Sequence, residues 1–168
     1  MAKPFVAVLM GSSSDLPTME ETLSVLNALR IPFEVKITSA HRTPDATHEY
    51  VQDADQRGCA VFIAAAGMAA HLAGTVAGLT TRPVVGVPLS SGPLQGVDAL
   101  LSTVQMPGGI PVACVAVGKA GARNAGYLAA QILAISDPEL TVRLRDDRQA
   151  NAEKVRDTDR QLQERYHS

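Results

Sequence analysis

The chain has 168 residues, a length that suits one domain with a substantial buried core. Its formal net charge is -2, and Lys and Arg form no stripe on any predicted helix, which argues against a nucleic-acid partner. Cys59 and Cys114 lie far apart, which excludes a disulfide framework and a CxxC zinc site, and we expect both to be small core residues.

Short apolar runs alternate with longer stretches of helical periodicity, the pattern of repeated βαβ units around a parallel sheet. The predicted strands are residues 5–9, 33–37, 61–65, 84–87 and 112–117. The predicted helices between them are residues 16–29, 44–56, 71–79, 97–104 and 123–135. Asp15 is placed to cap the first helix, and Thr43 with Pro44 to begin the second. The strands are rich in β-branched residues, so we expect helices on both faces of the sheet.

The N-terminal apolar run at residues 5–10 is interpreted as the first strand. It lacks the pattern of a signal peptide and is far shorter than a membrane-spanning helix. We therefore expect a cytoplasmic protein with no membrane partner.

Charge is distributed unevenly along the chain. Of the 17 acidic and 15 basic residues, 15 lie in residues 137–168, which leaves 17 for the preceding 136 positions. A body so poor in charge predicts that other subunits cover much of its exterior, so we expect a homo-oligomer. We divide the chain into a catalytic domain, residues 1–136, and a charged C-terminal helix or tail, residues 137–168.

The C-terminal helix is predicted over residues 138–160, with a thin apolar stripe of Leu140, Leu144 and Val155. Such a helix buries little against its own domain. Two placements are open, a solvated tail and an arm laid on a neighbouring subunit, and we adopt the arm as the working prediction.

Four loops follow the first four predicted strands and carry most of the polar, chemistry-bearing residues. In a parallel sheet these loops emerge at one edge, where open α/β sheets bind their ligands. The four segments are residues 11–15, 39–43, 66–72 and 88–96. We expect them to form one site.

The first loop offers Gly11, Ser12, Ser13, Ser14 and Asp15. Its backbone N–H groups and hydroxyls precede a helix, where the helix dipole favours an anion. The spacing is neither a Walker A motif nor GxGxxG, so neither a nucleoside triphosphate nor a dinucleotide is indicated. The alternative is an ordinary strand-to-helix turn capped by Asp15.

The second loop places His41 beside Arg42, directly before a helix. An imidazole can take a proton from carbon or oxygen and return it near neutral pH. Arg42 is suited to a bidentate phosphate contact. The alternatives are a histidine that only bonds backbone and an arginine in a surface ion pair.

His71 lies in the third loop among small residues that let backbone approach a ligand closely. A second acid–base role and a role in orienting the loop or capping its helix both remain open. His48 and His167 are assigned no role. No HExxH or clustered Cys and His indicates a metal, and no GxSxG elbow indicates a hydrolase.

Five motifs, spread over roughly residues 6–133, resemble the N5-carboxyaminoimidazole ribonucleotide mutases of purine biosynthesis. They are MGSxSD at residues 10–15, SAHRTP at 39–44, AAHLxG at 69–74, GVDALLSTVQMPGGIPVA at 96–113 and GKAGARNA at 118–125. The resemblance implies a flavodoxin-like three-layer αβα sandwich with a five-stranded parallel sheet, assembled as an octamer.

The resemblance also implies a reaction, in which a carboxylate moves from an exocyclic nitrogen of the ribonucleotide to ring carbon 4. It implies no cofactor and no metal, and a carbon dioxide intermediate held in the site. His41 matches the proton-shuttling histidine, and His71 matches a histidine of the loop that closes on the base. The expected substrate-binding residues are Ser12, Ser14, Asp15, Ser39, Arg42, Gly67 and Leu72.

Two positions depart from the family pattern. Met68 stands where a second glycine is usual, and Ala73 where a proline is usual. We expect a negative φ at Met68, because a side chain is costly at positive φ. Arg42 and His71 favour a mutase over the related carboxylases that use free carbon dioxide. That carboxylase activity and a non-catalytic module sensing a phosphoribosyl ligand are the alternatives.

Overall fold

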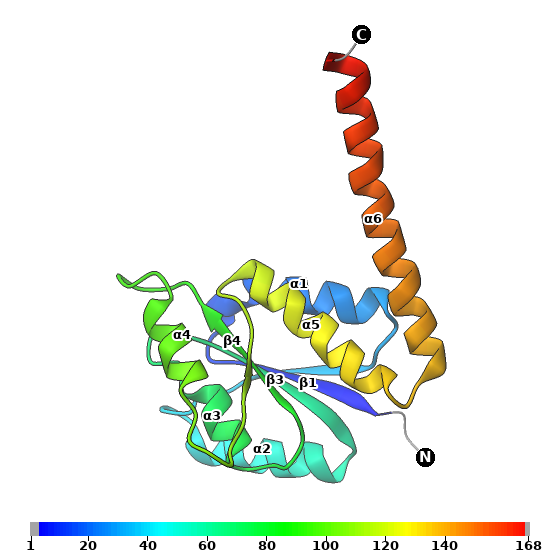
Figure 1. The fold of residues 1–168 in the computed structure, drawn as a ribbon. Coiled ribbons are helices and arrows are strands. Elements are labelled where there is room, and N and C mark those ends of the chain that lie inside the picture. Colours follow the sequence, from blue (N-terminus) through cyan, green and yellow to red (C-terminus); the bar gives the residue numbers. More distant parts are fainter. Residues whose placement is uncertain (1–3, 167–168) are drawn as a thin grey trace.

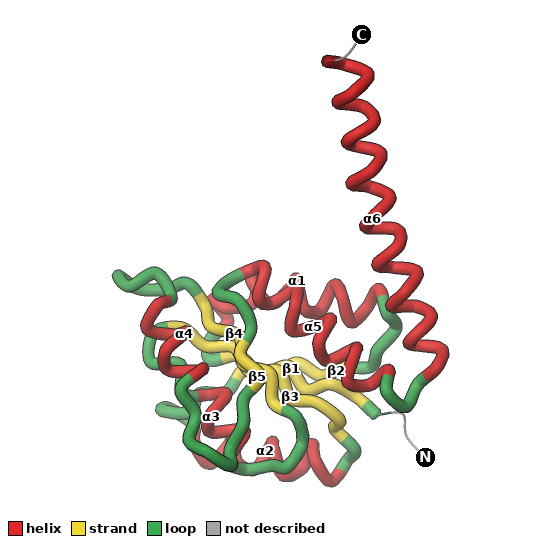
Figure 2. The backbone as a smooth tube through the Cα atoms, in the orientation of Figure 1, coloured by secondary structure: helices red, strands yellow, loops and turns green. Residues whose placement is uncertain are grey.

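In the computed structural model, which describes residues 4–166, the sheet is built around strand β1, Phe5–Met10, whose six residues are all buried. β1 pairs in parallel with β2, Phe33–Ile37, and with β3, Cys59–Gly67. β4, Val84–Leu89, and β5, Ala113–Cys114, complete the order β2-β1-β3-β4-β5 (Figure 2). This is the strand order of flavodoxin-like folds, so the expected fold is confirmed.

Two layers of helices enclose the sheet. α1 and α5 cover one face, and α2, α3 and α4 cover the other (Figure 1). A short 3-10 turn, η1, leads into α1. The bounds are η1 Ser13–Asp15, α1 Leu16–Ala28, α2 Pro44–Gln56, α3 Leu72–Ala77, α4 Val97–Val104, α5 Lys119–Ala134 and α6 Pro138–Tyr166.

Side chains of β1 alternate between two cores because successive strand residues point to opposite faces. Val6, Val8 and Met10 join the core beneath α1 and α5. Phe5, Ala7 and Leu9 join the core beneath α2 and α3. Both faces of the three central strands are thus covered, as the sequence predicts.

The edge strands differ from the prediction. Val35 and Ile37 of β2 are 44% and 54% exposed, so helices do not cover that edge fully. β5 has only two residues, Ala113 and Cys114, where residues 112–117 were predicted, and it pairs with β4 alone. Cys59 is buried as expected, whereas Cys114, on the edge strand, is only partly buried.

α2 and α4 have the predicted bounds, α1 ends one residue early at Ala28, and α6 continues to Tyr166 rather than ending at residue 160. α3 is shorter than residues 71–79, with His71 at its N-cap position. α5 begins at Lys119 rather than at residue 123 because Gly118, at φ 76°, turns the chain directly into the helix. Gly121 is then part of the first turn, where its backbone lies against the Ala116 carbonyl and a Cβ would not fit.

α6 has 29 residues, a length of about 43 Å at 1.5 Å per residue. Leu140 is buried against the body, and the Arg143 Nε donates to the Leu29 carbonyl at 3.0 Å. The helix then runs away from the body (Figure 1), and Val155 is 71% exposed. An arm on a neighbouring subunit and a solvated tail are both compatible with this shape.

None of the helices within residues 4–166 combines the length and hydrophobicity that crossing a membrane requires. His167 lies outside the described residues.

Candidate active site

A cavity of about 540 Å³ opens at the carboxyl edge of the sheet and is lined by residues of all four predicted loops. Open α/β sheets bind ligands at this edge. Every residue predicted for the site lines this one cavity: Ser12, Ser14, Asp15, Ser39, His41, Arg42, Gly67, His71 and Leu72.

The first loop is closed by its own polar side chains. The Ser12 Oγ accepts from the Ser14 N–H at 3.2 Å and from the Ser14 hydroxyl at 2.9 Å. The Asp15 carboxylate accepts from the Ser12 N–H at 3.1 Å, which completes a capping box around η1. Asp15 therefore caps the 3-10 turn and makes no side-chain cap bond to α1, because this turn comes between them.

Asp15 is a carboxyl group in a confined position. Its burial raises the pKa of Asp15 above the usual value, against the opposing effects of hydrogen bonds within the loop and of the Arg42 charge. A half-buried carboxylate with a spare oxygen beside the cavity is suited to accept hydrogen bonds from ligand hydroxyls.

The second loop is anchored from below by threonine hydroxyls. Thr38 and Thr47 are both buried, and their hydroxyls lie 2.7 Å apart. The Thr43 Oγ1 accepts from the Ser39 N–H at 2.9 Å and lies 3.2 Å from the Thr38 hydroxyl. Thr43 thus braces the turn through its hydroxyl, although it makes no side-chain cap bond to α2.

Ser39 shapes the turn that carries His41 and Arg42. Its Oγ accepts from the His41 N–H at 3.3 Å and from the Arg42 N–H at 3.1 Å. The Arg42 guanidinium reaches across to the first loop, where Nη2 donates to the Gly11 carbonyl at 2.9 Å. One donor of the guanidinium fork is thereby used to join the two loops.

The two predicted catalytic histidines contact each other. The His41 Nε2 lies 2.7 Å from the His71 Nδ1, with the rings 79° apart in an edge-to-face arrangement. One nitrogen of such a bond must carry the proton and the other must offer a lone pair. The bond therefore couples the tautomers of the two rings, because the nitrogen that carries the proton in one ring requires the facing nitrogen of the other ring to accept it.

The third loop is where the prediction for Met68 is wrong. Met68 has φ 53°, in the left-handed region, and is 54% exposed. The loop therefore keeps a glycine-like backbone with a side chain attached. Leu72 also lines the cavity, but it is 3% exposed and belongs mainly to the core, so a ligand can touch only its edge.

The fourth loop contributes Ser91, which the sequence analysis did not single out. Its side chain lies over Gly67, where a Cβ would overlap the Ser91 hydroxyl. The sequence indicates residues 88–96 as a segment of the site because they follow a strand. Within that segment, only the contact with Gly67 distinguishes Ser91 from its neighbours, and that contact is visible only in the structure.

Comparison with known proteins decides the family. The AIR carboxylase family model matches residues 5–154, nearly the whole described chain. The chain belongs to the AIR carboxylase family. The resemblance inferred from the motifs is thereby confirmed.

Curated relatives of this AIR carboxylase family member match most of its length. It is 51% identical over 160 residues to the N5-carboxyaminoimidazole ribonucleotide mutase of Bacillus subtilis, which covers 95% of this chain and 99% of the relative. The Escherichia coli K12 protein of the same name is 51% identical over 150 residues, 89% of each chain. A crystal structure of Treponema denticola PurE has a TM-score of 0.86 at 30% identity, covering 95% and 99% of the two chains.

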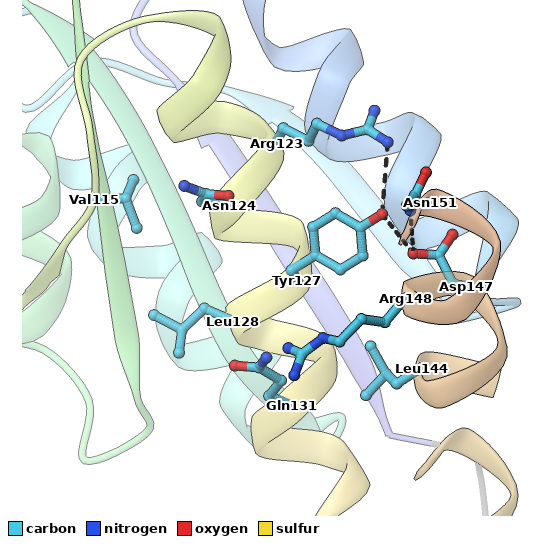
Figure 3. Close-up of a pocket in the computed structure, with 10 residues that line it drawn as sticks. All are labelled: Val115, Arg123, Asn124, Tyr127, Leu128, Gln131, Leu144, Asp147, Arg148 and Asn151. Carbon is cyan, nitrogen blue, oxygen red and sulfur yellow. Dashed lines mark hydrogen bonds between the residues drawn. The ribbon is translucent and has the colours of Figure 1, made fainter. Parts of the chain in front are cut away.

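A second hollow of about 490 Å³ lies between α5 and α6 of this AIR carboxylase family member (Figure 3). Tyr127 donates to Asp147 at 2.7 Å, and Asn151 donates to the same carboxylate at 3.0 Å. These groups satisfy one another and tie α6 to α5. None of the 10 side chains drawn there is a residue predicted for the site.

Within the described part of the chain, no group of three or more His, Cys, Asp and Glu side chains is placed to hold a metal ion.

Proposed function

We propose that this enzyme is an isomerase that converts N5-carboxyaminoimidazole ribonucleotide to 4-carboxy-5-aminoimidazole ribonucleotide, a step of purine biosynthesis. The observation that carries the proposal is the His41–His71 pair, 2.7 Å apart, lining the same cavity as Arg42. About half of all residues are shared with relatives named for this mutase activity.

The ribonucleotide is bound by the first two loops. Arg42 clamps the phosphate, because a guanidinium offers paired donors that a phosphate accepts. The Asp15 carboxylate and the Ser12 hydroxyl bind ribose and phosphate oxygens, with Ser14 and Ser39 in support. The Arg42 bond to the Gly11 carbonyl already brings these two loops together.

The chemistry needs one proton to change places. The N–C bond to the carboxylate breaks, the nitrogen takes up a proton, and carbon dioxide is released beside the base. Ring carbon 4 then attacks carbon dioxide, the new C–C bond forms, and the proton on carbon 4 must leave. His41 gives the nitrogen its proton when the N–C bond breaks and later takes up the proton that leaves carbon 4, so it ends in its starting protonation state and no outside acid or base is needed.

His71 supports this transfer through its bond to His41. The bond fixes the direction of the His41 ring and provides a neighbouring nitrogen on which a proton can reside. Carbon dioxide is neutral and small, so it must be held close to carbon 4 for recapture to compete with escape. Gly67 and the small residues around it leave space for it beside the base.

Direct carboxylation of aminoimidazole ribonucleotide is the competing activity, and one experiment separates the two. Purified protein is mixed with carboxyl-labelled N5-carboxyaminoimidazole ribonucleotide, without ATP or bicarbonate. Rapid conversion with the label retained supports the mutase. Conversion that depends on added bicarbonate and aminoimidazole ribonucleotide would assign the carboxylase. Binding without turnover would leave a ligand-sensing module.

We also propose that the enzyme works as a homo-oligomer, an octamer on the family resemblance. α4 supports this, because Val97, Leu101 and Val104 form a stripe at helical spacing and are 58%, 55% and 47% exposed. Native mass spectrometry tests the subunit count. The arm formed by α6 is expected to pack on a neighbouring subunit in that assembly.

The reaction is placed in the cytoplasm, since a phosphorylated ribonucleotide is charged and does not cross membranes unaided. The proposed chemistry uses no cofactor and no metal ion. Activity unchanged after dialysis against a chelator checks the second point.

A further inference from the structure

The third and fourth loops meet through two reciprocal contacts. The Ser91 side chain lies directly over Gly67, so that a Cβ at Gly67 would overlap its hydroxyl. The Met68 side chain lies over Gly92, with Cγ and Sδ each 3.2 Å from the position of a Cβ built on that glycine. Each loop thus supplies one glycine and one side chain that covers the glycine of the other.

Met68 makes its half of this contact from an unfavourable backbone conformation. Its φ is 53°, where a side chain is disfavoured and glycine is not. Gly92, at φ 69°, leaves room for the thioether. A strained conformation persists where surrounding contacts hold it and often accompanies a functional constraint.

These contacts between the third and fourth loops lie at the cavity of the candidate active site. Met68 and Ser91 both line the cavity, and His71 follows three residues after Met68 in the same loop. Ser90 to Gln95 are all exposed, so the two glycine contacts tie an otherwise solvated segment to the loop of His71.

We propose that Met68 is a positioning residue that holds residues 90–95 in place, and with them Ser91 in the wall of the cavity, and so retains the one-carbon intermediate. This inference rests on the proposed function. A thioether is apolar and adaptable, and it fills the space above Gly92 that water would otherwise enter. The wall keeps the neutral intermediate beside its acceptor carbon long enough for recapture.

The test measures how much carboxyl label the product keeps when the labelled substrate reacts in unlabelled bicarbonate. Met68→Gly removes the covering side chain, and we expect label loss to rise roughly fivefold while KM changes little. Met68→Leu keeps an apolar side chain of similar size over Gly92, and we expect it to retain label like the wild type. Because glycine suits φ 53°, the unfolding temperature of Met68→Gly should not fall.

Met106→Ala is the matched control. The Met106 Sδ lies 3.2 Å from the position of a Cβ on Gly74, the same kind of contact, but Met106 does not line the cavity. We expect its label retention to equal that of the wild type. Equal label loss in Met106→Ala and Met68→Gly would overturn the proposal, and so would unchanged retention in Met68→Gly.

A fall in the unfolding temperature that accompanies label loss in Met68→Gly would also overturn it, by assigning Met68 a role in stability alone. Failure of the proposed function has a different signature. In that case the wild-type protein itself would leave the labelled substrate unconverted, or would exchange its label completely with bicarbonate.

Discussion

The His41 Nε2 and the His71 Nδ1 lie 2.7 Å apart, although 30 positions separate the two residues in the chain. The two loops meet because each follows a strand of one parallel sheet at the same edge. A proton-transferring group is therefore oriented by a partner from another βα unit, and substitutions in either loop should affect the same chemical step.

Replacing His41 with asparagine keeps a hydrogen-bonding side chain but removes the titratable nitrogen. We expect kcat to fall by roughly 10² or more while ribonucleotide affinity survives. Steady-state kinetics and calorimetric binding check the two parts. His48→Asn, on the exposed surface of α2, is the control and should behave as wild type. Near wild-type turnover in His41→Asn would remove His41 from the mechanism.

Replacing Arg42 with lysine keeps the charge and loses the paired donors. Substrate affinity should fall, because an ammonium reproduces neither a bidentate phosphate contact nor, at the same time, the bond to the Gly11 carbonyl. We expect KM to rise roughly tenfold with a smaller change in kcat. Arg30→Lys, an exposed arginine elsewhere, serves as the control. Unchanged affinity would show that Arg42 does not clamp the phosphate.

The raised pKa of Asp15 predicts how the stability of the fold depends on pH. Burial raises its pKa in the fold above the value in the unfolded chain, so the folded state holds the proton more tightly. The contribution of Asp15 to stability is therefore greatest below its ordinary pKa of 3.8 and declines as pH rises through the raised value. Asp15→Asn should lack this decline, since its amide oxygen still accepts from Ser12.

Chemical denaturation of both proteins across that pH range measures the difference in the free energy of unfolding. The free energy of unfolding of the wild type, minus that of Asp15→Asn, should fall as pH rises. A difference that grows with pH would contradict the assignment, because it would mean that the fold favours the ionised carboxylate.

Gly67 should tolerate alanine only when its neighbour makes room. A Cβ there would overlap the Ser91 hydroxyl and lie 3.1 Å from the Ser91 Cβ, so Gly67→Ala must rotate the Ser91 hydroxyl away and crowd its Cβ, and should lower kcat/KM roughly tenfold. Ser91→Gly removes the overlapping atoms, and the next contact, the Leu89 carbonyl, lies at 3.6 Å. The double variant should thus be more active than Gly67→Ala alone. Strict additivity in this cycle would mean that the two residues do not interact.

The apolar stripe on α4 predicts which substitution should weaken assembly of the homo-oligomer. Leu101→Glu places a charge at the centre of the stripe, and the subunit count in native mass spectrometry should fall. Gln52→Glu adds the same charge on the exposed surface of α2 and should leave the assembly intact. An assembly unaffected by Leu101→Glu would move the interface to another face.

The sequence alone predicted those features that depend on periodicity and on order along the chain. Apolar runs located the central strands, and the loops after them were expected at one edge. It did not predict the length of β5, because composition does not show that only Ala113 and Cys114 pair with β4. It also failed at Met68, where contact with Gly92 outweighs the ordinary preference of a side chain for negative φ.

The hydrogen bonds of the small polar side chains were equally beyond the sequence. Ser12, Ser14 and Ser39 were expected to face a ligand, whereas their oxygens also bond within the turns that hold them. Small polar residues bond locally in many ways, and spacing does not distinguish support of a turn from contact with a ligand.

The hydroxyl network of Thr38, Thr43 and Thr47 has a consequence for recognition. It fixes the turn of His41 and Arg42 through the exposed Thr43, which is held from beneath by the buried Thr38 and Thr47, without a contribution from any ligand. The conformational entropy of that turn is therefore lost when the chain folds rather than when substrate binds. A mutation that loosens the threonines would lower affinity for every ligand of the site alike, without changing which ligand is preferred.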